Sequence, residues 1–232
     1  VIDKTIDYVN KNNLSFIDGF LYFTEAQVEK KKVNLVNHSV KMAGFPKIKT
    51  LADFDFEYHP SINQQQIYDL NSLRFIEKQE NVIFYGNSGV GKTHLATAIG
   101  IEASSKRNST YFIHFNDLMS KFKIAAQEGR IESVVKHYAK YKVLIIDEIG
   151  YLPIDKDSAN GFFQLVAARY ERRPIILTTN QPLSKWGDVF GDYTLANAII
   201  DRLVHHSYII KITGQSYRIK GKLLYEEENV EH

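Results

Sequence analysis

Short apolar runs alternate with longer amphipathic stretches from residue 81 onward. The apolar runs, which are rich in β-branched and aromatic residues, cover residues 81–85, 109–115, 142–147, 173–180 and 206–212. Helical candidates lie between them near residues 92–106, 116–127, 130–140, 157–172 and 194–205. Continuous apolar strands that alternate with helices are typical of a parallel sheet covered on both faces. The pattern therefore predicts an α/β domain with a parallel five-stranded sheet flanked by helices.

The chain before residue 81 has a different pattern. Residues 1–44 carry apolar positions scattered among polar ones without strand-like alternation, which predicts helix. Residues 45–60 are expected to form an extended connector, with prolines near both ends. Ser61 is placed to cap a helix that runs to about Gln79. We expect a helical N-terminal region and connector over 1–60, the α/β domain over 61–225, and a tail over 226–232 that is an expression-tag remnant.

Composition narrows the class of protein. The 232 residues are 44% hydrophobic and 24% charged, which is ordinary for a globular domain with one sizeable core. The absence of cysteine excludes disulfides and thiolate metal sites. No apolar run approaches the ~20 residues that span a bilayer, and the acidic and basic N-terminus does not match a secretory signal. We expect a cytoplasmic protein without a membrane partner, with a few residues missing before Val1.

The net charge of +2 hides an uneven distribution. Residues 1–50 hold eight lysines against five acids, including the run Lys30-Lys31-Lys32. Residues 202–222 contain two arginines and three lysines and no acid. Such stretches either meet phosphate backbones or form solvated faces, and the sequence leaves both readings open.

A glycine-rich segment follows the first predicted strand directly. It fits the pattern G-x-x-x-x-G-K-[ST] as Gly86, Asn87, Ser88, Gly89, Val90, Gly91, Lys92 and Thr93. Glycines let backbone N–H groups approach phosphate oxygens, and the following helix directs its positive N-terminus at the anion. Lys92 then places its charge on the β- and γ-phosphates, and the Thr93 hydroxyl is a magnesium ligand. The alternative is an incidental flexible turn, which the strand before and the helix after argue against.

A phosphate loop predicts a second strand that ends in acids, and VLIIDE at 143–148 supplies it. The carboxyl ends of parallel strands meet at one edge of the sheet, where Asp147 would hold magnesium through water. Glu148 is placed to orient and polarise the attacking water. The alternative is a strand that ends in two solvated acids.

Three further polar residues are candidates with open alternatives. Asn180, which follows the strand ending in LTTN, is placed to contact the attacking water or the γ-phosphate, or else only opens a turn. Arg202, near the end of the last predicted helix, is either an arginine finger acting on a neighbouring subunit or a helix-end charge. Arg218 either contacts nucleotide or is a basic surface residue. His94, directly after the loop, is grouped with the nucleotide-binding residues as a helix position, because no metal-ligand spacing surrounds it.

Five motifs in order resemble the IstB-like group of ATP-binding proteins, which are AAA+ ATPases close to the DnaC helicase loader. They are GNSGVGKTHLA, VLIIDEIGYLP, LTTNQPLSKWGDVFGD, DRLVHHS and GQSYR, and FPKIKTLADFDF resembles the entry segment of the family. The resemblance implies an AAA+ core, ATP and Mg²⁺ bound at Gly86–Thr93, Asp147 and Glu148 as the Walker B pair, and Asn180 as the sensor. It also implies that Arg202 is the arginine finger and that Arg218 contacts nucleotide. Only twenty residues follow the last predicted strand, so we expect the C-terminal lid to be reduced or absent.

The resemblance also implies a function. Members of the family work as homo-oligomers on duplex DNA and help the transposase of an insertion sequence to select its target. The main hypothesis is therefore an ATP-hydrolysing, DNA-associated AAA+ protein that serves a transposase. A replicative helicase loader with the same core is the alternative. An initiator of the DnaA type would need a further helix-turn-helix domain, and a metabolic kinase would not need Glu148, Asn180 and Arg202 together.

Overall fold

The computed structural model describes residues 6, 8–9, 11–12, 15–150 and 153–218. The predicted tail at 226–232 and the basic residues Lys220 and Lys222 lie outside this part of the chain, as do Tyr151 and Leu152 of the second motif. Among the described helices, none is both long and apolar enough to cross a membrane.

A parallel five-stranded sheet forms the centre of the molecule, in the order β2-β3-β4-β1-β5. The strands are β1 (Asn81–Gly86), β2 (Thr110–His114), β3 (Val143–Ile149), β4 (Ile175–Thr179) and β5 (Ser207–Ile212). The five predicted strands are confirmed to within three residues at each end. Because every strand runs the same way, the carboxyl ends form one edge of the sheet and the amino ends form the other.

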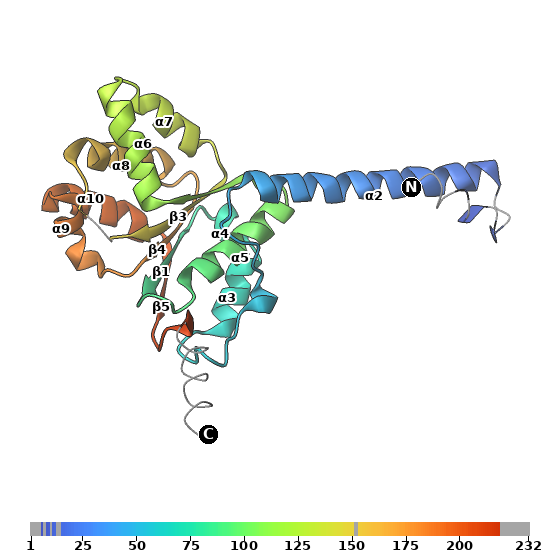
Figure 1. Cartoon of the computed structure of the whole chain (residues 1–232), viewed down its shortest axis with the longest axis horizontal. Helices are drawn as coiled ribbons and strands as arrows, with labels where there is room; N and C mark the ends of the chain where they lie inside the picture. Colours follow the sequence, from blue (N-terminus) through green and yellow to red (C-terminus); the bar gives the residue numbers. More distant parts are fainter. Residues whose placement is uncertain (1–5, 7, 10, 13–14, 151–152, 219–232) are drawn as a thin grey trace, which may run out of the picture.

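Helices cover both faces of the sheet, as Figure 1 shows. One face packs against α6 (Phe115–Gln127), α7 (Ile131–Ala139), α8 (Lys156–Arg169), α9 (Trp186–Phe190) and α10 (Tyr193–Val204). The other face packs against α3 (Gln64–Asn71), α4 (Arg74–Glu77) and α5 (Lys92–Ser105). In β1, alternate residues enter opposite cores: Ile83 faces the first layer, whereas Val82 and Phe84 face the second. A strand with both faces covered must be apolar throughout, which explains the unbroken apolar runs.

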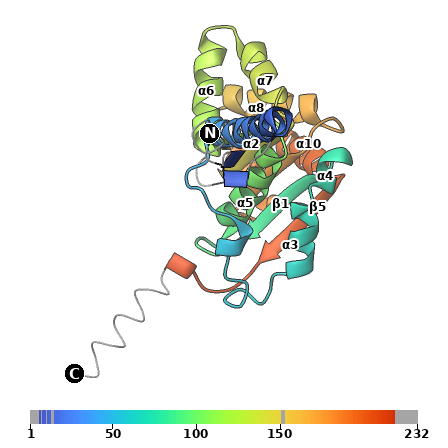
Figure 2. The same cartoon turned by 90° about the vertical axis from the view of Figure 1, so that its right-hand side faces the viewer.

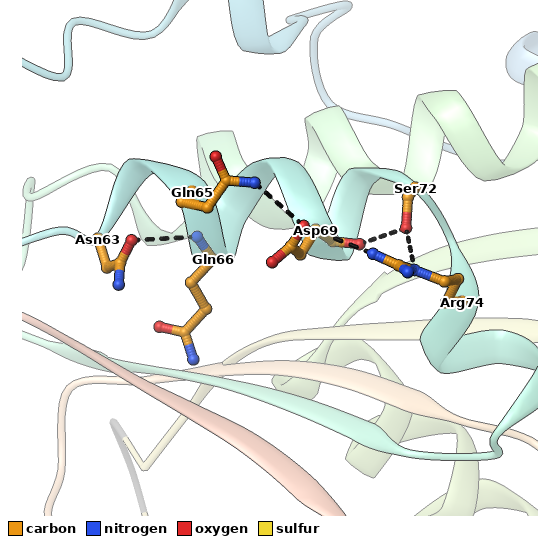
Figure 3. Close-up of polar contacts among 6 residues, drawn as sticks. All are labelled: Asn63, Gln65, Gln66, Asp69, Ser72 and Arg74. Carbon is orange, nitrogen blue, oxygen red and sulfur yellow. Dashed lines mark hydrogen bonds and ion pairs between the residues drawn. The ribbon is translucent and has the colours of Figure 1, made fainter.

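The predicted single helix over residues 61–79 is wrong. Asn63, not Ser61, caps α3 by accepting a hydrogen bond from Gln66 N (3.2 Å). The helix ends because Leu73 takes a left-handed conformation (φ 66°), after which the short α4 begins. Polar side chains hold the break, since Arg74 donates to Ser72 Oγ (3.1 Å) and lies 3.5 Å from Asp69 (Figure 3). Ser61 instead exchanges two hydrogen bonds with the backbone of Thr213 beyond β5.

The N-terminal helix α2 (Phe16–Met42) projects away from the sheet domain and is seen nearly end-on in Figure 2. Ser15 caps it by accepting from Asp18 N (3.2 Å). Its C-terminal end meets the domain, where the N–H of Phe112 in β2 donates to Ala43 O (2.7 Å). Along the projecting part many apolar side chains are exposed, for example Phe16 at 86% and Ile17 at 69%. The segment after α2 returns across the carboxyl edge of the sheet and includes the 3-10 turn η1 (Leu51–Asp53).

Candidate functional site

A cavity of about 590 Å³ opens at the carboxyl edge of the sheet. Four parts of the chain line it: the glycine-rich loop, the ends of β2, β3 and β4, the segment that precedes α3, and the segment that follows β5. The lining includes Lys49, Phe54, Ser88, Gly89, Gly91, Lys92, Thr93, His94, His114, Asp147, Glu148, Asn180, Tyr217 and Arg218. Most of the predicted site residues therefore share one concave site, although they come from distant parts of the sequence.

The glycine-rich loop takes conformations that other residues adopt at a cost. Gly89 and Gly91 have φ angles of +80° and +95°. A Cβ on Gly91 would lie 2.6 Å from the ring of Phe54, and one on Gly89 would collide with the Ser216 side chain. Val90 is fully buried and anchors the loop, and α5 begins at Lys92. The first turn of α5 thus presents its unpaired N–H groups toward the cavity.

Lys92 is buried, with 8% of its surface exposed, yet it has no acidic hydrogen-bond partner within the described residues. Its Nζ donates to Gly86 O (2.8 Å) and Asn87 O (2.7 Å), which are carbonyls of its own loop. Burial lowers the pKa of Lys92, and the charges of Asp147 and Glu148 act in the opposite direction. A buried ammonium held only by carbonyls can exchange these for the stronger attraction of a polyanion.

Asp147 is almost completely buried (1% exposed) and lies at the centre of a polar cluster. It accepts hydrogen bonds from the hydroxyls of Thr93 (2.9 Å) and Thr178 (2.6 Å), and His114 Nδ1 lies 3.5 Å from its other oxygen. The carboxylate is thereby fixed beside the Thr93 hydroxyl. Two oxygen ligands at this separation, open to a cavity, are the protein contribution that Mg²⁺ usually needs when phosphates complete its shell.

Glu148 and Asn180 lie on adjacent strands at the mouth of the same cavity. Glu148 takes a left-handed conformation (φ 65°) inside β3, and its N–H donates to Thr178 Oγ1 (2.9 Å). This irregularity interrupts the regular alternation of side chains along the strand, and the Glu148 side chain faces the cavity. Asn180 Oδ1 is buried and accepts no hydrogen bond from the described residues. A buried amide oxygen of this kind suits a ligand or water that the cavity receives.

The two candidate arginines occupy different surroundings. Arg218 lines the cavity beside Tyr217, whose N–H donates to Gly89 O (3.0 Å) and so holds this segment over the loop. Arg202 does not line the cavity of its own chain. Its guanidinium lies 5.0 Å from the Phe163 ring centroid and donates to Ala198 O (2.8 Å). Of the two candidate arginines, Arg218 therefore reaches this cavity and Arg202 does not.

The sequence interpretation missed the contribution of the segment before α3 and of β2. His94 contacts the segment before α3, because its Nε2 lies 2.9 Å from Thr50 O and its ring meets the Phe54 ring edge-on. Burial lowers the pKa of His94. Phe54 and Asp53 close the cavity from a stretch that the sequence marked only as a connector. His114 is the last residue of β2 and pairs in register with Asp147 of β3, and its place near the end of a predicted strand is the signal that could have indicated it.

A nucleoside triphosphate and Mg²⁺ fit the donors that are present. The positive-φ glycines form a cradle that side chains would fill, Lys92 offers a cation, and Thr93 and Asp147 offer paired oxygens. The buried Asn180 oxygen adds an unpartnered acceptor to the lining of the same cavity. The glycine cradle and the Lys92 cation suit phosphate oxygens, and the paired oxygens of Thr93 and Asp147 suit Mg²⁺.

Comparison with known proteins agrees with this geometry. A family model described as "IstB-like ATP binding protein" matches residues 3–224. An ATP-binding protein of insertion sequence IS232 from Bacillus thuringiensis subsp. berliner is 53% identical over 98% of this chain and 91% of its own length. The corresponding protein of IS5376 from Geobacillus stearothermophilus is 42% identical over 96% of this chain and 88% of its own length.

Solved structures give the fold. The crystal structure of DnaI matches with a TM-score of 0.60 at 23% identity, covering 71% of this chain and 91% of that one. AMPPCP-bound DnaA from Aquifex aeolicus matches with a TM-score of 0.59 at 22% identity, covering 78% of this chain and 56% of that one. The predicted AAA+ P-loop fold is confirmed, as is the family resemblance. With its family model matched over nearly the whole length, the chain belongs to the IstB-like ATP-binding proteins.

Proposed function

We propose that the protein is a Mg²⁺-dependent ATPase that assembles on duplex DNA and assists the transposase of an insertion sequence. One observation carries the ATPase part: Lys92, Thr93, Asp147, Glu148 and Asn180 converge on a single cavity at the carboxyl edge of the sheet. A site that only binds a nucleotide would need no more than the glycine-rich loop and the Lys92 cation. A carboxylate and an orphaned amide facing the same space suit the activation of water.

Each residue has a distinct role in this proposal. Lys92 leaves the loop carbonyls and contacts the β- and γ-phosphates, while Thr93 and Asp147 hold Mg²⁺. The bound Mg²⁺ supplies charge neutralisation for the phosphate oxygens. Glu148 accepts a proton from water, and Asn180 orients that water toward the terminal phosphate. Arg218 neutralises phosphate charge within the same chain, from its place in the cavity lining.

Arg202 completes the site of a neighbouring copy in this proposal. Its support is positional: it lies outside the cavity of its own chain, and its contacts within the described residues are an aromatic face and one carbonyl. A guanidinium in such a setting can turn to a phosphate at modest cost. ATP then favours assembly, because it bridges two subunits, and turnover weakens the contact.

The DNA and transposase parts draw on the relatives and on charge. The two relatives reported above are named for insertion sequences. Of the described basic residues in the stretch 202–222, Arg202 packs on Phe163 and Arg218 lines the cavity, which leaves Lys211 as an exposed lysine. Lys30, Lys31 and Lys41 are exposed on the projecting helix α2, which makes this helix the better candidate for phosphate contacts. Repetition of α2 in an assembly multiplies a small charge excess.

A mixing experiment tests the shared catalytic site. The Arg202→Ala variant keeps Glu148 but lacks the finger. The Glu148→Gln variant keeps Arg202 but lacks the carboxylate that activates water. Each variant alone should therefore lack turnover. An equimolar mixture should recover about a quarter of wild-type turnover per chain, because about one interface in four joins the intact halves. Loss of activity in the mixture, with assembly shown by light scattering, would contradict catalysis across the interface. Wild-type turnover by Arg202→Ala alone would remove the finger role.

A binding experiment tests the DNA part. With ATP and Mg²⁺, affinity for duplex DNA measured by fluorescence anisotropy should fall steeply between about 50 and 200 mM salt. The Lys30→Gln/Lys31→Gln variant should flatten this dependence, whereas Lys185→Gln, an exposed lysine of the sheet domain, should not. A flat salt response of the wild type, together with capture of a replicative helicase and not of a transposase, would favour the helicase-loader alternative.

A further inference from the structure

A second group of ligating side chains lies at the amino edge of the sheet, opposite the nucleotide cavity. Glu171 lies in the connection from α8 to β4, and His205 and His206 form the connection from α10 to β5. One ligand atom from each lies within 4.8 Å of the other two. All three side chains are about half exposed, at 52%, 51% and 52% respectively. Neither the fold nor the ATPase proposal uses this cluster.

The distances fit a shared ion better than direct pairing. Glu171 Oε1 lies 3.4 Å from His206 Nε2 and 3.8 Å from His205 Nδ1. Both separations exceed the range of about 2.7–3.2 Å for a normal N–H···O hydrogen bond. The 3.4 Å separation matches the edge of a tetrahedron around Zn²⁺, which is about 3.4 Å for metal–ligand bonds of about 2.0–2.1 Å, and the 3.8 Å separation is longer than this edge. The atoms are therefore spaced as ligands around a common centre.

We propose that Glu171, His205 and His206 form a site for a divalent transition-metal ion of the Zn²⁺ class. Two imidazole nitrogens and one carboxylate oxygen are a donor set that Zn²⁺, Ni²⁺ and Cu²⁺ prefer, whereas Mg²⁺ and Ca²⁺ prefer oxygen alone. The exposure of all three side chains leaves room for water as the fourth ligand. The left-handed backbone of Glu171 (φ 53°) turns the chain so that its carboxylate meets the two histidines.

Tyr170 is a neighbour that competes for this site. Its hydroxyl lies 2.6 Å from His205 Nδ1, the nitrogen nearest to Glu171. The tyrosine must release this nitrogen when a metal binds. Removal of the hydroxyl should therefore strengthen metal binding, whereas it would weaken a cluster that exists only as a hydrogen-bond network. The effect of removing the Tyr170 hydroxyl therefore distinguishes a metal site from a hydrogen-bond network.

An ion at this position would join two junctions of the fold. It would link the end of α8 to the end of α10, whose Arg202 already packs on Phe163 of α8. An ion that binds only the folded chain raises its stability by mass action. The site would thus act as a clamp on the helix pair that carries the proposed finger, without contact with the nucleotide.

The test uses the full chain without a metal-affinity tag, stripped with chelator and titrated with Co²⁺ or Zn²⁺ in excess Mg²⁺. The Mg²⁺ occupies the second possible cluster, His114, Asp147 and Glu148, at the nucleotide cavity. We expect one ion per chain, the visible absorbance of tetrahedral Co²⁺, and a higher melting temperature. His206→Ala and Glu171→Gln should each weaken binding by more than about tenfold, since even outer-shell changes cost that much. Tyr170→Phe should strengthen it.

The matched control is His38→Ala, which removes an exposed histidine on α2 and should leave the titration unchanged. All variants should melt alike in chelator, because the altered side chains are exposed. Unchanged Zn²⁺ binding in the His205→Ala/His206→Ala double variant would overturn the proposal, and so would the absence of saturable binding by the wild type. Loss of binding in His114→Ala would assign the ion to the nucleotide cavity instead.

Discussion

The two edges of the sheet use buried polar side chains in opposite ways. At the carboxyl edge, Lys92, Asp147 and Asn180 face an open cavity, and Asn180 Oδ1 has no partner among the described residues. At the amino edge, the buried polar side chains Asn81 and Arg169 bind the backbone around them. The same chemical groups thus serve a ligand at one edge and the fold at the other.

Arg169 binds the backbone of the amino edge through its two terminal nitrogens, while its Nε has no hydrogen-bond partner among the described residues. It is 1% exposed and donates to five carbonyls, those of Tyr138, Ala139, Tyr141, Lys142 and Pro174, at 2.6–3.4 Å. Burial lowers its pKa to about 9, and the nearby charge of Arg173 acts in the same direction. Since guanidinium does not lose its proton in proteins, we take the carbonyl cage as what keeps the charge tolerable. The cage joins the end of α7 and the starts of β3 and β4.

Asn81 also bonds to the surrounding backbone, on the other side of β4. Its amide donates to Leu203 O (3.0 Å) and accepts from Ile175 N (2.8 Å). It thereby ties the start of β1 to the end of α10 and the start of β4. The comparison teaches that convergence of polar side chains on one cavity, and not burial of polar groups as such, marks the functional edge.

The largest expected effect comes from breaking the amino edge at its centre. Arg169→Met should lower the free energy of unfolding by on the order of 3–5 kcal/mol, because five carbonyls lose a charged donor whose side chain is buried. Urea denaturation followed by circular dichroism measures this loss. At a temperature where the variant stays folded, its affinity for ATP should equal that of the wild type. Full stability of the variant would show that the carbonyls need no donor.

The next effect concerns turnover at the carboxyl edge. Glu148→Gln should reduce ATP hydrolysis by about 10²–10³-fold, because an amide cannot accept the proton of the attacking water. ATP affinity and unfolding free energy should stay close to the wild type, since the backbone N–H contact with Thr178 is kept. Steady-state phosphate release measures the rate. Turnover within a few-fold of the wild type would assign water activation to another group.

A smaller effect is expected on ground-state binding. Lys92→Ala should weaken ATP binding by about 100-fold or more, because it removes a buried charge-assisted contact of up to about 3 kcal/mol. Isothermal titration gives the affinity. The same change should alter unfolding little, since Lys92 satisfies only carbonyls that water can reach through the cavity. Retained affinity would contradict the phosphate-loop assignment.

The smallest prediction concerns a turn at the amino edge. Gln79 is exposed and left-handed (φ 60°) just before β1, so Gln79→Gly should relieve strain and raise stability by about 0.5–1 kcal/mol. Thermal melting detects the gain, and ATP turnover should not change. A loss of stability would mean that the glutamine side chain contributes contacts that outweigh the strain.

Much of the fold follows from the sequence because the strands are apolar on both faces. The runs that contain Ile83, Ile145 and Leu177 need no knowledge of partners to be read as buried strands. The break at Leu73 was not predicted, because an apolar residue at a helical position gives no sign of left-handed backbone. The prediction that Ser61 caps a helix is wrong for a similar reason, because its hydroxyl bonds to Thr213, a residue 152 positions away.

The candidate site divides in the same way. Gly86–Thr93 and Asp147–Glu148 stand in local patterns, and spacing alone suggests their chemistry. Phe54 and His114 carry no such pattern and reach the cavity only through chain topology. Arg169 and Asn81 were not identified either, because a single polar residue in an amphipathic stretch gives no hint of the carbonyls it will meet. Sequence therefore indicates the contiguous parts of the site and misses those assembled by the fold.

A crystal structure of the protein with Mg²⁺ and a slowly hydrolysed ATP analogue tests the central claim most directly. We predict a triphosphate within Gly86–Thr93, Mg²⁺ between Thr93 and Asp147, and Lys92 Nζ moved from the carbonyls of Gly86 and Asn87 onto the phosphates. A nucleotide bound elsewhere, or a Lys92 that still holds those two carbonyls beside bound nucleotide, would contradict the account.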